Sequence, residues 1–179
     1  LPVVIGVGAN QINSIVDKSL ASLLGTDVVA SFSYAIKLYE FVQALFITSI
    51  LAVIYPRLSS MIVSERMDSF LNSLKKTMNV IIVALVPIIV GCIVKQIVEV
   101  LFQRNAFTSK DTTMTASILL IYVIGILAFA LRDVLTRGFY SMEDSKTPMI
   151  NSIISIVFNI SLNLILVKPL GYKGLAIAT

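Results

Sequence analysis

The sequence predicts an all-α fold, a polytopic integral membrane helix bundle with about five transmembrane helices and the start of a sixth. Two observations support this prediction. Hydrophobic residues make up 57% of the 179-residue chain and charged residues only 13%, whereas soluble domains average about 25% charged residues. The apolar residues also gather into runs of about 20, the length that an α-helix needs to cross the hydrocarbon core of a bilayer.

Six apolar segments follow one another along the chain. We expect helices over approximately residues 2–24, 28–55, 77–101, 109–138 and 148–167, and another that begins at 174. Gly25 marks the turn between the first two, and Pro56 ends the second because proline cannot continue a regular helix. Thr108 and Asp111 have the spacing of a capping box and start the fourth. Thr147-Pro148 supplies an N-cap and a first-turn proline for the fifth.

The region between the second and third helices, residues 57–76, mixes charged and apolar side chains. This pattern predicts either an amphipathic segment at the membrane surface or an ordinary solvated loop. The side of the membrane that holds this region has six basic residues, namely Arg57, Arg66, Lys75, Lys76, Arg137 and Lys146. The opposite side has four, namely Arg104, Lys110, Lys168 and Lys173. The positive-inside rule places the first side in the cytoplasm.

Several kinds of chemistry are missing from the sequence. It has no histidine and one cysteine, Cys92, so that neither an intrachain disulfide nor a zinc site built from Cys and His can form. Cys92 is expected to be a small packing residue. We find no Gly-rich phosphate loop and no serine with a base partner, and therefore expect no enzyme. The net charge of +4 is scattered along the chain, which argues against binding to nucleic acid.

Two charged residues, Lys37 and Glu40, fall near the middle of the second helix. A charge at that depth costs at least about 2.5 kcal/mol on insertion scales. Lys37 and Glu40 are three residues apart and share a helix face, with Ser33 and Gln43 above and below them. This face is either a structural ion pair inside the bundle or a lining that binds a polar or ionic cargo. The substrate-binding candidates are therefore Lys37, Glu40, Ser33 and Gln43.

A second group of polar residues lies on other helices. Asp17 belongs to a polar stretch of the first helix, while Asn159 and Asn163 belong to a seam of Asn and Ser at every fourth position of the fifth. Together with Thr179 they offer oxygen atoms, the ligands that hard cations such as sodium prefer. Interhelical hydrogen bonding without an ion is the alternative interpretation. No other cofactor is expected.

Six stretches of the chain form an ordered set of motifs. They are Gln11-Ile12-Asn13 with Asp17, Ser33-Tyr34-Ala35-Ile36-Lys37-Leu38-Tyr39-Glu40-Phe41, Tyr55-Pro56-Arg57-Leu58-Ser59, Val100-Leu101-Phe102-Gln103-Arg104-Asn105-Ala106-Phe107, Gly138-Phe139-Tyr140-Ser141 with Lys146-Thr147-Pro148, and residues 169–179. Over nearly the whole chain and in this order, they resemble the MurJ (MviN) family of lipid II flippases.

The resemblance implies a fourteen-helix transporter of two six-helix lobes plus two extra helices. Residues 1–179 would be a partial transmembrane lobe, an internal piece comprising helices seven to eleven and the start of twelve. The family moves the lipid-linked peptidoglycan precursor, lipid II, outward across the bacterial cytoplasmic membrane by alternating access, through a cationic cavity, for cell wall synthesis. The expected partners are lipid II, membrane lipids and the remaining helices of the same transporter. The alternatives are a related polysaccharide-lipid or multidrug exporter of the same superfamily, and a non-transporting membrane scaffold.

The resemblance also carries over to single residues. Lys37 stands at the position of a family arginine that lines the cavity, and Glu40 matches a motif glutamate. Lysine keeps the charge but lacks the bidentate fork suited to a pyrophosphate. Ile36 replaces the motif's aspartate, and Asp133 stands where many members carry lysine. Positions proposed to bind sodium in some members correspond to Asp17, Asn159, Asn163 and Thr179.

Overall fold

The computed structural model describes residues 2–90, 94–104 and 107–179, so that Cys92 lies outside the described residues. Within these ranges every regular element is a helix. In chain order they are α1 (Pro2–Leu24), α2 (Thr26–Val42), the π-helical η1 (Gln43–Thr48), α3 (Ser49–Val63), α4 (Met67–Val90), α5 (Val94–Phe102), α6 (Ser109–Ser141), α7 (Lys146–Leu170) and α8 (Tyr172–Ala178).

Four helical stretches are long and apolar enough to cross a membrane. They are Thr26–Val63, Met67–Val86, Ser109–Ser141 and Lys146–Leu170. Many large apolar side chains remain exposed on them, among which Val83 on α4 is 72% exposed and Ile165 on α7 is 65% exposed. Exposed apolar surface of this extent is expected where lipid tails or further helices cover a bundle. The predicted all-α membrane bundle is confirmed.

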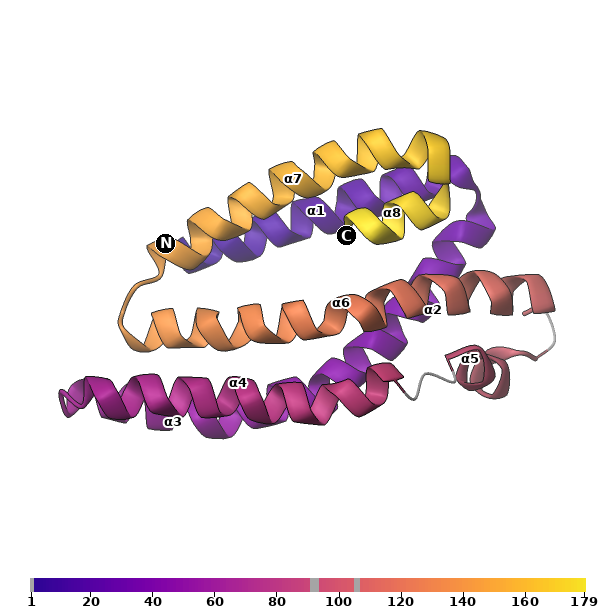
Figure 1. Cartoon of the computed structure of the whole chain (residues 1–179). Coiled ribbons are helices and arrows are strands. Elements are labelled where there is room, and N and C mark those ends of the chain that lie inside the picture. Colours follow the sequence, from indigo (N-terminus) through magenta and orange to yellow (C-terminus); the bar gives the residue numbers. More distant parts are fainter. Residues whose placement is uncertain (1, 91–93, 105–106) are drawn as a thin grey trace.

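Helix α6 is the centre of the arrangement. It contacts α2, α3, α4, α5, α7 and α8, and its residues Ile118, Ala130 and Val134 are fully buried. On one side of α6, α1 packs along α7, and α8 folds back against both (Figure 1). On the other side lie α3 and α4, which pack as a hairpin, while α2 crosses between the two groups. The polar faces of α1, α2, α6, α7 and α8 therefore meet in the same region.

The predicted end of the second helix at Pro56 is wrong. Helical structure continues from Thr26 through η1 and past Pro56 to Val63. A proline removes one backbone hydrogen bond, here to the carbonyl of Ala52. Leu58, two residues further on, is fully buried where α3 packs along α4. This packing offsets the lost bond, and the helix ends only at the turn before α4.

Both interpretations of residues 57–76 are also wrong. These residues complete α3 and begin α4, with only a short turn at 64–66 between them. Phe70 is 1% exposed, and Phe70 and Leu74 lie against Gly138 of α6. The amphipathic pattern is therefore the packing face of a helical hairpin. The helix expected over 77–101 is correspondingly divided between α4 and α5.

The starts of α6 and α7 are stabilised by side chains. The capping box of Thr108 and Asp111 is confirmed, with the Thr108 backbone N–H donating to Asp111 at 2.8 Å. For α7, Thr147 is not the N-cap. Its backbone N–H and its hydroxyl both donate to the Asp144 carboxylate, at 3.0 and 2.6 Å. A capping aspartate three residues before Thr147 therefore starts α7, which begins at Lys146.

A glycine-dependent hairpin sets the position of α8. Gly171 between α7 and α8 has a φ of 56°, a conformation that glycine adopts at little cost. A Cβ on Gly174 would overlap the backbone carbonyl of Leu166, so that only glycine permits this approach of α8 to α7. The hairpin turns Ala178 and Thr179 back toward the polar seam of α7.

Candidate functional site

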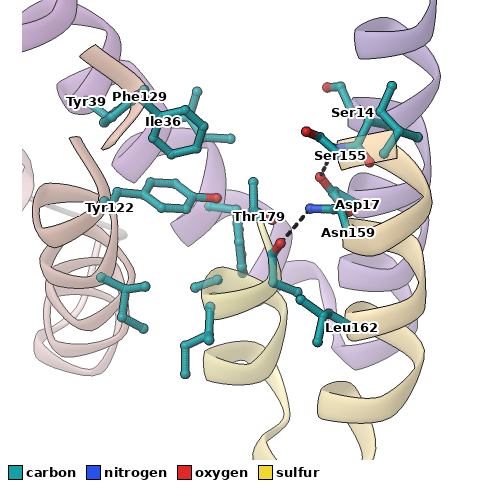
Figure 2. Close-up of a pocket in the computed structure, with 18 of the residues that line it drawn as sticks. Ser14, Asp17, Ile36, Tyr39, Tyr122, Phe129, Ser155, Asn159, Leu162 and Thr179 are labelled. Atoms are coloured by element: carbon teal, nitrogen blue, oxygen red, sulfur yellow. Dashed lines mark hydrogen bonds between the residues drawn. The ribbon is translucent and has the colours of Figure 1, made fainter. Parts of the chain in front are cut away.

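A cavity of about 780 Å³ lies between α1, α2, α6, α7 and α8 (Figure 2). Its α2 wall is one helix face at alternating three- and four-residue spacing, formed by Ser33, Ile36, Glu40 and Gln43. Its α6 wall is a second such face, formed by Tyr122, Gly125, Phe129 and Arg132. The remaining walls come from polar residues of α1 and α7 and from the end of α8. The cavity is therefore amphipathic, with aromatic and aliphatic surfaces beside polar ones.

Arg132 is a cavity residue that sequence reasoning assigned only to the membrane interface. Its guanidinium lies 5.2 Å from the ring centroid of Phe129 and 3.0 Å from the carboxylate of Asp133. The side chain is 56% exposed, and part of its donor fork therefore remains open to a ligand. The spacing of Tyr122, Gly125, Phe129 and Arg132 along one helix face was the signal that could have identified it.

The cross-link between the α2–η1 junction and α6 differs from the expected pairing. Asp133 does not pair with Arg137. Its carboxylate binds Arg132 and also accepts a hydrogen bond from the Gln43 amide at 3.2 Å, while Arg137 lies over the ring of Tyr55 at 5.5 Å. The π-helical stretch begins at Gln43, and such stretches are frequent at functional sites.

Lys37 and Glu40 do not form an ion pair, since neither takes part in the two salt bridges found among the described residues. Glu40, Ser33 and Gln43 line the cavity, but Lys37 is not among the lining residues. Its exposed side chain places the ammonium 5.7 Å from the ring centroid of Tyr34. Lys37 directly follows Ile36, and one residue turns a helix by about 100°, which takes Lys37 away from the cavity face.

A buried hydrogen-bond network joins α1, α7 and α8 beside the cavity. The Asn163 amide is fully buried and donates to Asp17 at 2.6 Å and to Asn159 at 2.7 Å. The Asn159 amide donates in turn to the carbonyl of Ala178 at 2.8 Å. Figure 2 shows Asp17 and Asn159 facing the end of α8, with Thr179 between them and the Tyr122 ring. The structure thus brings the four predicted cation ligands together.

The donor set suits a hard cation rather than a transition metal. Among the described residues, no three His, Cys, Asp or Glu side chains gather. Asp17, Asn159 and Thr179 contribute one carboxylate, one amide and one hydroxyl, and the Asn163 Oδ1 atom is buried without a hydrogen-bond partner. An orphaned buried oxygen beside a carboxylate fits the oxygen coordination of an alkali cation.

A membrane helix lobe with a large amphipathic cavity at its centre defines the class of this protein as a polytopic membrane transporter. The comparison with solved structures agrees. A lipid II flippase MurJ in an inward closed conformation superposes with a TM-score of 0.84 at 28% identity, covering 96% of this chain and 36% of that one. A multidrug resistance transporter of the MATE family, of the MOP superfamily, also gives a TM-score of 0.84, but at 16% identity it shows the fold alone.

The comparison of sequences identifies the family. The family model described as lipid II flippase MurJ matches residues 1–179. Probable lipid II flippases MurJ of Vibrio cholerae and Helicobacter pylori are 38% and 31% identical over 100% and 99% of this chain. The chain belongs to the MurJ lipid II flippase family and is a multi-pass protein of the cytoplasmic membrane. It spans 34% and 39% of the length of these two relatives.

Proposed function

We propose that this chain forms part of the second helical lobe of a flippase that moves lipid II outward across the cytoplasmic membrane by alternating access, for peptidoglycan synthesis. The observation that supports a cargo-binding role is the cavity of about 780 Å³, whose walls combine the cations Lys18 and Arg132 with aromatic and apolar surface. Membership of the family supports lipid II as the cargo.

The cavity residues divide between the chemical parts of such a cargo. Arg132 offers its guanidinium fork to the pyrophosphate, since arginine matches phosphate oxygens in a bidentate way. Ser33, Glu40 and Gln43 offer hydrogen bonds to sugar hydroxyls. The rings of Tyr39 and Phe129, whose centroids are 6.0 Å apart, offer an apolar surface to the sugar faces or to the lipid. We infer that these residues bind and release the cargo without a catalytic step.

Lys37 is assigned a role outside the cavity of this lobe. Its ammonium is exposed, and the chain covers only 36% of the solved MurJ structure. We therefore propose that Lys37 contacts the cargo together with parts of the transporter beyond residues 1–179. The partners of the chain would then be the remaining helices of the transporter, lipid II and the surrounding membrane lipids, and no nucleic acid.

We further propose that Asp17, Asn159, Asn163 and Thr179 hold a sodium ion during the transport cycle. The partnerless Asn163 oxygen supports this assignment. When bound, the ion would supply positive charge to the Asp17 carboxylate in place of the Asn163 amide hydrogens. The alternative, hydrogen bonding without an ion, already satisfies the other buried atoms of the network, and the two are separated by the sodium dependence of stability described in the Discussion.

The test uses the full-length transporter as the sole copy in cells, at equal expression. We would measure how much lipid II becomes accessible on the outer face for wild type, Arg132→Gln and Arg132→Lys. We expect exposure to be lost with glutamine and partly restored with lysine. Lys37→Ala and Lys37→Arg are compared in the same way. Failure of the wild type itself to expose lipid II would favour the exporter alternative, and full tolerance of Arg132→Gln together with Lys37→Ala would favour the scaffold.

A further inference from the structure

A second hollow lies outside the central cavity, in the hairpin of α3 and α4. It has a volume of about 240 Å³ and shares no lining residue with the cavity. Its polar part is formed by Arg57 of α3 and by Ser73 and Lys76 of α4. Its apolar part is formed by Ile50, Ile54 and Val80. We call this feature the hairpin groove.

The groove lies across the level at which both helices change from charged to apolar. In α3, no residue between Ser49 and Pro56 is charged, and in α4 none is charged from Thr77 to Val90. Arg57 and Lys76 are therefore the last charged residues before the apolar part of each helix. Tyr55 lies next to this level, as aromatic residues do at membrane interfaces. One end of the groove thus lies among lipid headgroups and the other faces the acyl chains.

The polar end of the groove holds donors without acceptors. Among the residues that the structure describes, neither Arg57 nor Lys76 forms an ion pair with a carboxylate, and both side chains are exposed. The Ser73 hydroxyl donates only to the thioether sulfur of Met61, at 3.5 Å, and thioether sulfur is a weak acceptor. Two cations and one hydroxyl are thus available to a single anionic group.

We propose that the hairpin groove binds an anionic glycerophospholipid of the surrounding membrane. The headgroup phosphate would lie between Arg57, Lys76 and Ser73, and one acyl chain would lie along Ile50, Ile54 and Val80. A soluble phosphate ion would leave the apolar half of the groove uncovered. A protein helix would have to bring carboxylates to this depth, at a cost of about 2.5 kcal/mol or more for each. A lipid supplies the charge and the apolar chain together.

The experiment measures binding of fluorescent phosphatidylglycerol to the purified full-length transporter in phosphatidylcholine nanodiscs. Wild type is compared with Arg57→Gln/Lys76→Gln and with the matched control Arg66→Gln/Lys75→Gln, which removes the same charge from the same hairpin outside the groove. Basic residues near a membrane surface contribute about 1 kcal/mol each. We therefore expect about a 30-fold loss of affinity in the groove variant, which is about 2 kcal/mol at 1.4 kcal/mol per tenfold, and near wild-type binding in the control.

Further arms keep the result specific. Arg57→Lys/Lys76→Arg, which preserves the charge, should bind like wild type, and near-identical melting curves show that all variants are folded. Equal losses in the groove and control variants would overturn the proposal in favour of general surface charge. Displacement of the lipid by glycerol phosphate alone would overturn it in favour of a simple phosphate site. Because the groove and the cavity share no residue, these outcomes do not depend on lipid II transport.

Discussion

The buried amide of Asn163 makes the strongest prediction about stability. Its NH2 group donates to Asp17 on α1 at 2.6 Å and to Asn159 on its own helix at 2.7 Å. The substitution Asn163→Ala removes both hydrogen bonds. It leaves the Asp17 carboxylate and the Asn159 oxygen without their amide donor, in a place where Asn163 itself is 0% exposed.

The magnitude follows from the kinds of hydrogen bond that are lost. A hydrogen bond to a charged group contributes about 1.5–3 kcal/mol to stability, and a neutral interhelical bond within a membrane contributes about 0.6 kcal/mol on average. The sum predicts a loss of about 2–4 kcal/mol. The control, Asn151→Ala, changes the same residue type on the exposed part of the same helix and should cost less than about 0.5 kcal/mol.

The assay is equilibrium unfolding of the full-length transporter in mixed detergent micelles, at fixed sodium concentration. If Asn163→Ala and Asn151→Ala change the free energy of unfolding by equally small amounts, the network does not hold α1 to α7, and the reasoning is refuted. A loss confined to Asn163→Ala supports it.

Three further predictions follow from other features. Asn163→Asp adds a second carboxylate beside Asp17, so that sodium, but not choline, should raise the melting temperature of the variant more than that of wild type; equal shifts would contradict the cation site. Gly174→Ala places a Cβ on the α7 backbone and should cost about 1–3 kcal/mol in unfolding free energy, whereas Gly8→Ala, with open space around it, should cost nothing; similar values would argue against the close approach of α8. Hydrogen bonds from the Thr147 side chain and backbone hold the pKa of Asp144 below its usual value. The ionised carboxylate therefore stabilises the folded state above about pH 4, the pKa of an unfolded aspartate, and this contribution is lost as the pH falls through the lower folded pKa. Hydrogen exchange at the start of α7 should accelerate below that pH in wild type, and Asp144→Ala should exchange fast at every pH; an unchanged profile would contradict the cap.

The helices of this chain are largely predictable from hydrophobic runs and capping motifs. The Thr108–Asp111 capping box depends only on neighbouring residues, so that the sequence alone is enough to place it. Pro56 misled because the cost of a proline is local, while the burial of Leu58 against α4 depends on tertiary packing. Likewise, the charges of residues 57–76 suggested a loop because the packing of Phe70 on α6 is not visible from composition.

The candidate site is predictable only in part. Asp17, Asn159, Asn163 and Thr179 were expected from their residue types and from the family resemblance, and the fold brings them together. The cation of the cavity was not predicted, because Lys37 and Arg132 look alike as charges within apolar runs. Their helix faces separate them, since Ile36 rather than Lys37 continues the face of Ser33 and Glu40. That distinction requires knowledge of which face α6 covers.

The most direct test of the central claim is to locate the cargo. A photoreactive phenylalanine analogue is placed in the full-length transporter either at Gln43, which lines the cavity, or at Phe41, which is 65% exposed and not among the lining residues. Purified protein is then irradiated with lipid II. We predict a lipid II adduct at position 43 that is lost when Arg132→Gln is added, and little adduct at position 41. Equal labelling at both positions, or labelling indifferent to Arg132, would contradict a cargo site in this cavity.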